Sequence, residues 1–506
     1  MKRGDVLIAG AGPTGLVLAL WLTKLGVNVR IIDKTAAAGT TSRALAVQAR
    51  TLELYRQLDL TDSVLQRGHK VPAINLWARG KRAARVSFET IAENLSPYGP
   101  FVFPQDQHEL LLIERLAAAG VIIERNTELL RFNSSSDAVS ATVRTADGRE
   151  ESCKFDYLAG CDGARSIVRQ GIGAGYPGGT YDQLFYVADI DGAGPALDGE
   201  LHIGLDQADF LAVFPLKGAG RARLIGTVRG ARAAHPEKLR FDDVSAAAIE
   251  HMKVKVRTVN WFSTYHVHHR VADRFRQGRI FLLGDAAHIH SPAGGQGMNT
   301  GIGDAINLAW KLHGVLDEHA SDALLDSYEV ERRAFALKLV ATTDRGFTLA
   351  TAESRTAAFI RMRIVPIALP ALFKLAAARK YLFRAVSQLV IDYRMSAISS
   401  GSAGRIHGGD RLPWAKTSHR DNFDTLATPQ WQLHVYGSVS ANLAAWCASR
   451  VTLQAFEWEA AYAAAGFTKD AMYLIRPDAY IALAHKEQDP AIIERYLWQH
   501  GLRLAL

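Results

Sequence analysis

Cysteine is scarce in this chain, with only Cys153, Cys161 and Cys447 among 506 residues. The three form no C-x-x-C pair and have no spacing that matches a metal site. The sequence therefore excludes a disulfide framework and a dithiol relay, and it indicates a reducing compartment, the cytoplasm.

Long hydrophobic runs are also absent, since no stretch approaches the roughly 20 apolar residues of a membrane span. Met1-Lys2-Arg3 precedes an apolar segment as in a signal peptide, but Asp5 and the glycines that follow interrupt it. We therefore expect no stable membrane insertion. Residues 359–391 are apolar with interspersed Arg and Lys, and we expect them to pack on a core, with a helix pair that touches a membrane as the alternative.

Dense basic runs are missing too, although the net charge is +8 and the pI about 9.3. The Lys and Arg residues are dispersed and are not interleaved with aromatics, so we expect no nucleic-acid partner. The histidines at 266, 268 and 269 lack metal-ligand spacing, because alternation along a strand puts His269 on the opposite face from the other two. We therefore predict no metal site.

A glycine-rich turn lies close to the N-terminus. The apolar segment 5–9 leads into Gly10-Ala11-Gly12-Pro13-Thr14-Gly15, and a helical run follows from Leu16 to Leu25. A G-x-G-x-x-G turn between strand and helix brings backbone N–H groups to a pyrophosphate at the helix N-terminus. A second strand, 27–32, ends in Asp33, a carboxylate placed to accept the adenosine ribose hydroxyls. The order of strand, glycine turn, helix, strand and acid favours a dinucleotide-binding site. The alternative is a turn whose glycines serve only close packing.

A second glycine-rich element distinguishes a flavin from a nicotinamide as the bound dinucleotide. The buried strand Ile280–Leu283 leads to Gly284-Asp285, and an irregular loop with Pro292, Gly295 and Gly297 precedes a helix expected from Gly301 to Leu312. Ligands of open α/β sheets bind at the carboxyl ends of strands. A carboxylate there accepts bonds from ribityl hydroxyls, and the helix N-terminus favours negative charge on a reduced flavin ring. An acid that caps the turn is the alternative.

A third element, Asp162-Gly163, follows a predicted strand at 155–159 and is flanked by Arg165 and Arg169. The acid is suited to fixing backbone or ribose groups, and the arginines are suited to phosphates. On the residues alone, an ordinary turn with a solvated basic face is the better explanation, and only the family resemblance given next reverses this. The chain has no separate nicotinamide-binding unit with its own G-x-G-x-x-G.

Four stretches together resemble the group A FAD-dependent aromatic hydroxylases, the family of para-hydroxybenzoate hydroxylase and phenol hydroxylase. They are the first glycine turn, 41–44 with 50–53, 160–169 and the segment around Gly284-Asp285, and the resemblance extends over residues 1 to about 400. It implies a mixed α/β fold with a Rossmann-like FAD domain, an inserted β-rich substrate domain and a thioredoxin-like C-terminal domain. The cofactor contacts expected from the motifs and the resemblance are Gly10, Gly12, Pro13, Gly15, Asp33, Arg43, Gln105, Asp162, Gly163, Arg165, Gly284, Asp285, Pro292, Gly295, Gly297, Met298 and Asn299.

The expected domain boundaries follow this pattern. The FAD domain comprises 1–178 with 275–345, the substrate domain comprises 179–274 with part of 76–100, and helices occupy 346–397. A Gly/Ser linker at 399–404 precedes the thioredoxin-like domain at 405–506. With only Cys447 in that domain, we expect it to serve packing or dimerisation, and a homodimer is the expected assembly.

The resemblance implies a monooxygenase with non-covalent FAD, which NAD(P)H reduces and O2 then oxidises through a flavin hydroperoxide that hydroxylates an aromatic small molecule. Residues 44–49 contain no acid, whereas phenol hydroxylase has a carboxylate there, so a larger phenolic, quinonoid or polycyclic substrate is expected. No side chain is assigned a covalent role, and Tyr186, His202 and Phe214 are candidate substrate contacts. Baeyer–Villiger oxygenation, flavin chemistry without oxygen insertion, and an FAD-bound partner protein without turnover are the alternatives.

Overall fold

The computed structural model describes residues 5–39, 44–88, 95–204, 210–228, 239–244, 246–291, 295–351 and 359–504. In this part of the chain, a six-stranded sheet with the order β18-β19-β12-β1-β2-β8 forms the first layer. Its strands are parallel except for β18, which is antiparallel to β19. The bounds are β1 Asp5–Ala9, β2 Asn28–Ile32, β8 Ile123–Glu124, β12 Tyr157–Gly160, β18 Arg276–Gln277 and β19 Ile280–Leu282.

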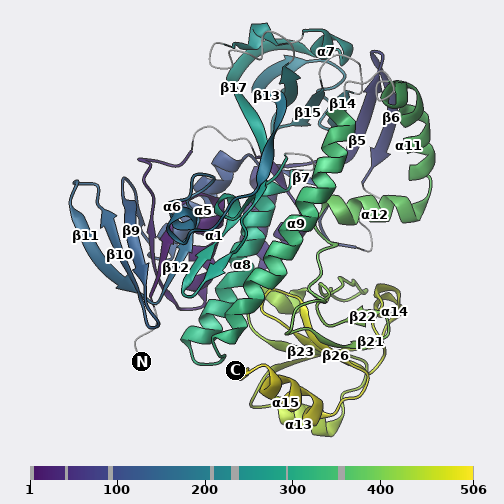
Figure 1. Cartoon of the computed structure of the whole chain (residues 1–506). Helices are drawn as coiled ribbons and strands as arrows, with labels where there is room; N and C mark the ends of the chain where they lie inside the picture. The colour runs from purple at the N-terminus through teal and green to yellow at the C-terminus, as the bar shows by residue number, and fades with distance from the viewer. Residues whose placement is uncertain are drawn as a thin grey trace.

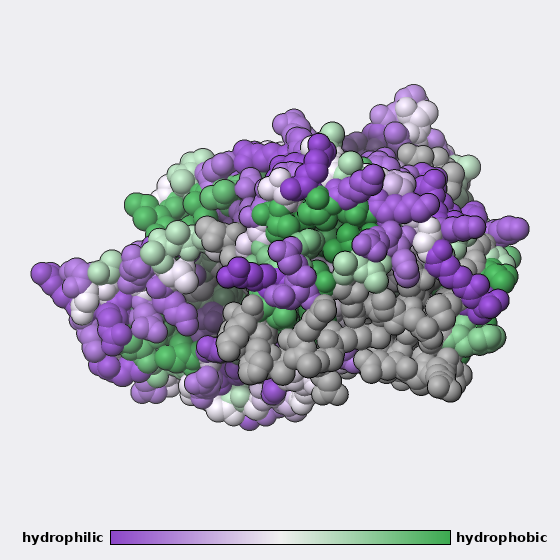
Figure 2. Space-filling model, turned by 90° about the horizontal axis from the view of Figure 1, so that it is seen from above, coloured by the Kyte–Doolittle hydropathy of each residue, from purple (hydrophilic) through white to green (hydrophobic). Residues whose placement is uncertain are grey.

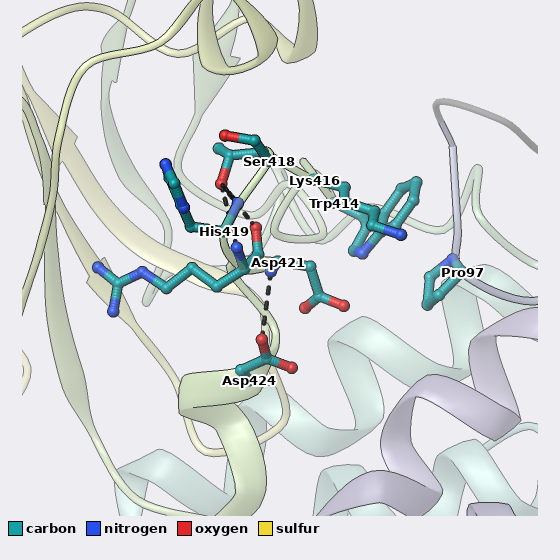
Figure 3. A pocket seen from close by; sticks show the side chains of 9 residues that line it. Pro97, Trp414, Lys416, Ser418, His419, Asp421 and Asp424 are labelled. Atoms are coloured by element: carbon teal, nitrogen blue, oxygen red, sulfur yellow. Dashed lines mark hydrogen bonds between the residues drawn. The ribbon is translucent and has the colours of Figure 1, made fainter.

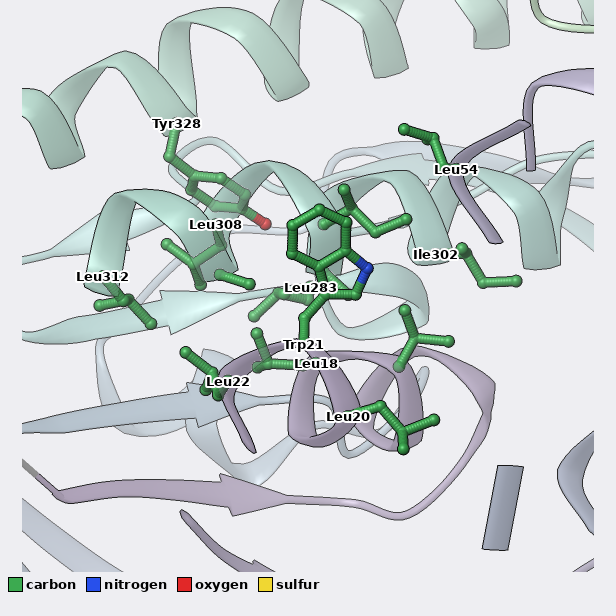
Figure 4. Close-up of a cluster of buried hydrophobic side chains, with 14 of the residues drawn as sticks. Leu18, Leu20, Trp21, Leu22, Leu54, Leu283, Ile302, Leu308, Leu312 and Tyr328 are labelled. Atoms are coloured by element: carbon green, nitrogen blue, oxygen red, sulfur yellow. The ribbon is translucent and has the colours of Figure 1, made fainter. Parts of the chain in front are cut away.

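Long helices pack on this sheet (Figure 1). Helix α1 is apolar and buried along most of its length, so it lies between the sheet and α8 instead of facing solvent. Trp21 and Leu18 of α1 meet Ile302 and Leu308 of α8 in the main core (Figure 4). The helices of this region are α1 Pro13–Lys24, α2 Ala49–Tyr55, α3 Thr61–Arg67, α5 Gln105–Ala118, α6 Ile167–Gly171, α8 Gly297–Leu316 and α9 Ala323–Thr351.

An eight-stranded sheet, which we call the middle sheet, lies above the first layer in Figure 1. Viewed from that end, the surface is largely hydrophilic, with hydrophobic residues in separate areas (Figure 2). Residues 73–87 join this sheet although they come much earlier in the chain. In sheet order the strands are β20 His288–Ile289, β17 Lys255–Val271, β13 Gly178–Ala193, β16 Arg221–Val228, β15 Leu211–Pro215, β14 Leu201–Gly204, β5 Ala73–Ala78 and β6 Lys81–Ser87.

The C-terminal region forms a separate mixed sheet with helices packed against it, as the resemblance to thioredoxin-like domains predicts. Strand β23 is parallel to β24 and antiparallel to β25. In sheet order the strands are β22 Ile406–His407, β21 Ser400–Ala403, β26 Ile481–His485, β25 Met472–Ile475, β23 Gln432–Tyr436 and β24 Thr452–Phe456, and the helices are α13 Ala441–Cys447, α14 Ala460–Ala465 and α15 Pro490–Gln499.

Smaller elements complete the described chain. One three-stranded sheet consists of β9 Glu128–Ser134, β10 Val139–Arg144 and β11 Glu150–Phe155, and a second consists of β3 Ala46–Val47, β7 Phe101–Val102 and β4 His69–Lys70. The remaining α-helices are α7 Ala246–His251, α11 Val365–Phe373 and α12 Ala376–Val386. The short 3-10 helices are η1 Arg56–Leu58, η4 Phe241–Asp243, η5 Gly284–Ala286 and η7 Asp424–Ala427, and η6 Ile360–Ile364 is a short π-helix.

The C-terminal region joins α8 and α9 through a buried ionic cluster. The side chains of Lys311, Glu331 and Arg476 have no exposed surface. Arg476 donates from Nη1 to Glu331 Oε1 at 2.8 Å and from Nη2 to Asp478 Oδ2 at 2.6 Å, and Lys311 Nζ donates to Glu331 Oε2 at 2.8 Å. Burial lowers the pKa of Lys311 to about 8. Two cations therefore face two anions, and removing either sign would leave a buried charge without its counterion.

Two expectations about the chain after residue 346 are wrong. Residues 400–403, expected to lie in a linker, form β21, which pairs with β26 and so belongs to the C-terminal sheet. Residues 359–391, expected to pack on a core, bury Phe383 and Leu389 but leave several large apolar side chains exposed between Phe359 and Tyr381. Local composition predicted neither outcome, because strand pairing and packing partners are set by distant segments.

Candidate cofactor site

The first glycine turn is shaped by close backbone contacts. A Cβ on Gly10, whose φ is +108°, would lie 2.2 Å from the carbonyl oxygen of Cys161, and one on Gly15 would lie 2.0 Å from that of Gly10. No atom lies within 4 Å of the corresponding position at Gly12. Gly12 caps α1 without a side-chain hydrogen bond, and the first turn has no acid. The open space beside unsatisfied N–H groups fits a pyrophosphate.

Asp33 lies directly after β2 and contacts the same turn. Its Oδ2 accepts a bond from the backbone N of Ala11 at 2.7 Å, and its Oδ1 accepts from Thr35 N at 2.8 Å and from Thr35 Oγ1 at 2.6 Å. These bonds fix the carboxylate beside the glycine turn. The parallel register of β1 with β2 brings both to one edge of the sheet.

The Gly284-Asp285 turn follows β19 at that edge. Gly284 has φ +57°, and a Cβ there would lie 2.6 Å from Thr14 Oγ1. The Asp285 side chain is exposed, and its backbone carbonyl accepts a bond from Tyr176 Oη at 2.8 Å. We call the residues at the carboxyl ends of β1, β2, β12 and β19, namely Gly10–Gly15, Asp33, Asp162–Gly163 and Gly284–Asp285, the cofactor edge.

A buried cluster of charged side chains supports the Gly284 turn. Asp304, without exposed surface, accepts bonds from Gly284 N at 3.0 Å, His288 Nε2 at 2.7 Å and Arg332 Nε at 2.6 Å. Burial by itself would raise the pKa of Asp304, but His288 and Arg332 outweigh it and lower the pKa. No sequence motif pointed to Asp304 or Arg332, since they lie inside α8 and α9 and come together only where these two helices pack.

Asp162 offers an unsatisfied acceptor at the cofactor edge. Its Oδ2 accepts from the backbone N of Ile167 at 2.7 Å and of Val168 at 3.1 Å, which caps α6. Its Oδ1 is buried and has no hydrogen-bond partner among the described residues, and burial raises the pKa of the carboxyl group. Such an oxygen needs a partner that the described residues do not supply, so a bound ligand group fits here. Gly163, with φ +76°, forms the turn that follows.

The loop before α8 is fixed by Asn299. Its Oδ1 accepts from Gln48 N at 2.9 Å and Thr51 Oγ1 at 2.8 Å, and its Nδ2 donates to Ala46 O at 2.8 Å and Gly295 O at 3.0 Å. The side chain of Asn299, expected to contact the cofactor, is therefore occupied by protein partners and holds the loop against β3 and α2.

The other expected contacts in this part of the site are placed as follows. Met298 packs on the main core, Gly297 begins α8, and Gly295 has φ +60° with a Cβ position 2.5 Å from Ala46 Cβ. Gln105 begins α5, where its Nε2 donates to Glu109 Oε1 at 2.7 Å and its N donates to Ala44 O at 3.1 Å. Arg43 and Pro292 lie outside the described residues.

The two faces of the middle sheet differ in what covers them. One face, which we call the outer face, buries Tyr186, Leu184 and Leu224 against residues of α7. The opposite or inner face packs with Leu45, Val71 and Val102, which lie in or next to the small sheet of β3, β7 and β4. Its buried members are Phe185, Val187, Ile225 and Val267, and Tyr181, Leu201, Phe210, Phe214, Trp261 and Tyr265 are only partly buried. The inner face therefore presents half-buried aromatic rings toward the FAD region.

Two of the three candidate substrate contacts, Tyr186 and His202, do not lie on the inner face. Tyr186 lies in the outer cluster with Phe262, at 6.1 Å between ring centroids. His202 is fully buried, accepts from Trp77 Nε1 at 2.8 Å and pairs through Nε2 with Asp198 Oδ1 at 2.7 Å. Phe214 lies on the inner face. Alternation along a strand separates two faces but does not tell which one a later helix will cover.

Comparison with known proteins agrees with this geometry. A family model described as FAD binding domain matches residues 3–343. The chain is 37% identical over 424 residues to 6-methylpretetramide 4-monooxygenase of Streptomyces rimosus, across 80% of this chain and 73% of that protein. The chain belongs to the group A FAD-dependent aromatic hydroxylases.

Two further relatives extend the similarity over nearly the whole hydroxylase. A flavin-dependent monooxygenase of Mycobacteroides abscessus is 31% identical over 495 residues, across 94% of this chain and 96% of that protein. The anhydrotetracycline hydroxylase OxyS of Streptomyces rimosus has a TM-score of 0.78 at 29% identity, with 100% of each chain covered. The protein is an FAD-dependent monooxygenase with a Rossmann-like FAD domain.

The two arginines near Asp162 have different environments in this hydroxylase. Arg165 is exposed beside the cofactor edge. Arg169, expected to meet phosphates, is buried instead and donates to the carbonyls of Ala286 at 3.0 Å and Ala164 at 2.8 Å, with its guanidinium 3.9 Å from the ring centroid of Tyr176. It therefore holds α6 against the Gly284 turn. The sequence could not separate the two, because both are arginines close to one acid.

A cavity of about 340 Å³ lies outside the cofactor edge, between residues 97 and 414–424 (Figure 3). Its acids Asp421 and Asp424 pair with Arg56 at 3.2 and 2.5 Å. The cavity thus marks the junction of the C-terminal region with the FAD region of the hydroxylase.

Within the described residues, no group of three or more His, Cys, Asp or Glu side chains is placed to hold a metal ion. His268 Nδ1 instead bonds Thr180 Oγ1 at 2.7 Å. None of the described helices has the length and apolar character that crossing a bilayer requires.

Proposed function

We propose that this monooxygenase hydroxylates a polycyclic phenolic or quinonoid ring, with electrons from NADH or NADPH and one oxygen atom from O2. The observation that carries the proposal is the inner face, where Phe210, Phe214 and Tyr265 present half-buried rings toward the FAD region. A row of aromatic rings suits a flat, fused substrate better than a single phenol. The relatives named for pretetramide and anhydrotetracycline chemistry support this substrate class.

The cofactor edge supplies the groups that FAD requires. The N–H groups at the start of α1 bind the pyrophosphate, Asp33 accepts from the adenosine ribose, and Asp285 accepts from the ribityl hydroxyls. The N-terminus of α8 favours negative charge on the reduced ring. When bound, FAD accepts two electrons from the nicotinamide and passes them to O2.

The remaining residues act on donor and substrate. We propose that the exposed Arg165 attracts the phosphates of the transient nicotinamide nucleotide, and that Asp162 accepts a hydrogen bond from FAD or from this donor through its unpaired oxygen. The inner face holds the aromatic ring in place and excludes water, so that the oxygen is transferred instead of escaping as hydrogen peroxide. Residues 44–49 include no acid, so deprotonation of the substrate by this segment is not part of the proposal.

The same proposal divides the chain into three parts. The FAD domain comprises 1–178 with 275–345, the substrate domain comprises 179–274 with 73–87, and the C-terminal domain begins at β21. We propose that the C-terminal domain serves packing, because its ionic cluster is closed within one chain. A homodimer and a cytoplasmic location remain expectations, which sedimentation analysis and cell fractionation test.

The deciding experiment follows isotope-labelled O2 through turnover. The purified protein is expected to be yellow, with about one non-covalent FAD per chain, and a matching aromatic should accelerate NADH or NADPH oxidation and gain one labelled oxygen. A colourless protein that takes up no flavin would overturn the proposal. An unlabelled product would indicate flavin chemistry without oxygenation, a ring-expanded lactone would indicate Baeyer–Villiger chemistry, and nucleotide oxidation that no aromatic accelerates would indicate a partner protein without turnover.

A further inference from the structure

The short π-helix η6 and the helices α11 and α12 expose an unusual amount of apolar surface. In the described residues, seven of the sixteen exposed large apolar side chains fall between residues 359 and 381. They are Phe359, Ile360, Ile364, Ile367, Leu372, Leu375 and Tyr381, which we call the apolar basic patch together with the exposed Arg363, Lys374, Lys380 and Arg384. Exposed apolar side chains gathered in this way mark an interaction surface.

The charge of the patch has one sign. From Arg355 to Ile391 the sequence contains seven Lys or Arg residues and no Asp or Glu. Elsewhere the chain mixes both signs, with 59 Lys and Arg against 51 Asp and Glu overall. A partner that covers this surface must therefore be apolar and negatively charged.

The apolar side chains stand on the outside of the molecule. Helices α11 and α12 lie at its periphery next to β5 and β6 (Figure 1). Ile367 is 75% exposed and Tyr381 73% exposed, whereas Phe383 on α12 is buried against Phe88. One side of α12 therefore packs on the rest of the protein, and the apolar side chains of the patch face outward.

We propose that the apolar basic patch docks the protein on the surface of an anionic lipid membrane. Short helices that carry Lys and Arg beside large apolar side chains lie in the interface plane, where the apolar groups enter the acyl boundary and the cations meet lipid phosphates. None of the described helices is able to cross a bilayer, so this contact is peripheral and reversible.

A second copy of the chain fits the patch less well. In a two-fold symmetric dimer the same surface meets itself, which would place the cations of one patch against those of the other. Like charges brought together across an interface oppose association. An anionic lipid surface supplies negative charge for the cations of the patch and an apolar interior for its apolar side chains.

The test is co-sedimentation of the FAD-loaded protein with vesicles. Binding to mixed phosphatidylglycerol and phosphatidylcholine vesicles should exceed binding to pure phosphatidylcholine by about tenfold or more and fall as salt is added. Failure to bind the anionic vesicles, or equal binding to both kinds, would overturn the proposal.

Paired variants separate the two contributions. Ile367→Ser with Leu372→Ser, and separately Lys374→Glu with Lys380→Glu, should each weaken binding about tenfold. The matched controls are Ile122→Ser, at a side chain 83% exposed outside the patch, and Lys486→Glu at another exposed lysine. FAD content and the thermal midpoint verify that each variant is folded. Controls that weaken binding equally, or a wild-type dimer that only the patch variants dissociate, would overturn the proposal.

Discussion

The cofactor edge and the inner face of the middle sheet contribute to one proposed site, but they are built in different ways. Backbone contacts shape the cofactor edge: Gly10 and Gly15 are confined by carbonyl groups only 2.2 and 2.0 Å from where a Cβ would lie. The inner face is built from side chains such as Phe185 and Tyr265, with ring centroids 5.9 Å apart.

This difference governs how each region tolerates change. A backbone contact admits one residue type, because any Cβ would collide with a group that cannot move. A face lined by side chains accepts other apolar residues of similar volume, so its shape is free to follow the substrate. We expect substitutions of the confined glycines at the cofactor edge to abolish function and those on the inner face to change substrate preference.

The largest effect is expected at Gly10. Gly10→Val places a branched side chain against the Cys161 carbonyl at φ +108°, where L-residues are strained, so FAD content should fall below about one tenth of wild type. Flavin absorbance of the purified protein measures this. Gly99→Ala, with no atom within 4 Å of its Cβ position, is the control. A yellow Gly10→Val protein would contradict the backbone description of this turn.

Next in size is Asp304→Ala, which removes the carboxylate shared by Gly284 N, His288 and Arg332. The unpaired buried cation should cost about 3–5 kcal/mol of stability, and the thermal midpoint should drop together with FAD retention. Asp326→Ala, at a side chain 75% exposed, should change little. Equal midpoints for both variants would show that the cluster does not support the turn.

Asp285→Ala tests the proposed ribityl contact. We expect FAD affinity to weaken by roughly 1–3 kcal/mol, with binding recovered in excess flavin. Titration of the apoprotein measures this, with Asp137→Ala in an exposed turn as the control. Unchanged affinity would place the contact at another residue.

Arg165→Ala should slow anaerobic flavin reduction by NADH or NADPH about tenfold while FAD retention changes less, because a charge-assisted bond to the donor is lost. Stopped-flow absorbance separates the two effects. Arg495→Ala, at an exposed arginine of α15, is the control. If FAD retention suffers more than reduction, Arg165 binds FAD and not the donor.

The smallest effect is expected from a pair of variants, one on each face of the middle sheet. Phe214→Ala should raise KM for the aromatic substrate about fivefold, which corresponds to roughly 1 kcal/mol of lost apolar contact, and should divert electrons to hydrogen peroxide. Tyr186→Phe, on the outer face, should leave KM unchanged. The reverse pattern in steady-state kinetics would assign the substrate to the other face.

The sequence was informative where function depends on backbone geometry. Gly10, Gly15 and the Gly284 turn belong to recognisable motifs because a Cβ at these positions would collide with neighbouring atoms. Asp304 and Arg332 were missed, since an acid and an arginine inside long helices have no local signature until the helices cross. The position of Tyr186 on the outer face could not be predicted, because the helix α7 that covers this face comes about 60 positions later in the chain.

The buried cluster of Lys311, Glu331, Arg476 and Asp478 also determines where the chain can be cut. A fragment that ends after the FAD-binding motifs would contain every recognised glycine turn, yet it would expose Lys311 and Glu331 and remove the two hydrogen bonds that Glu331 accepts from Arg476. Truncated proteins designed from motif boundaries alone should therefore be insoluble or bind little flavin. For this hydroxylase the minimal folding unit extends to the C-terminal sheet.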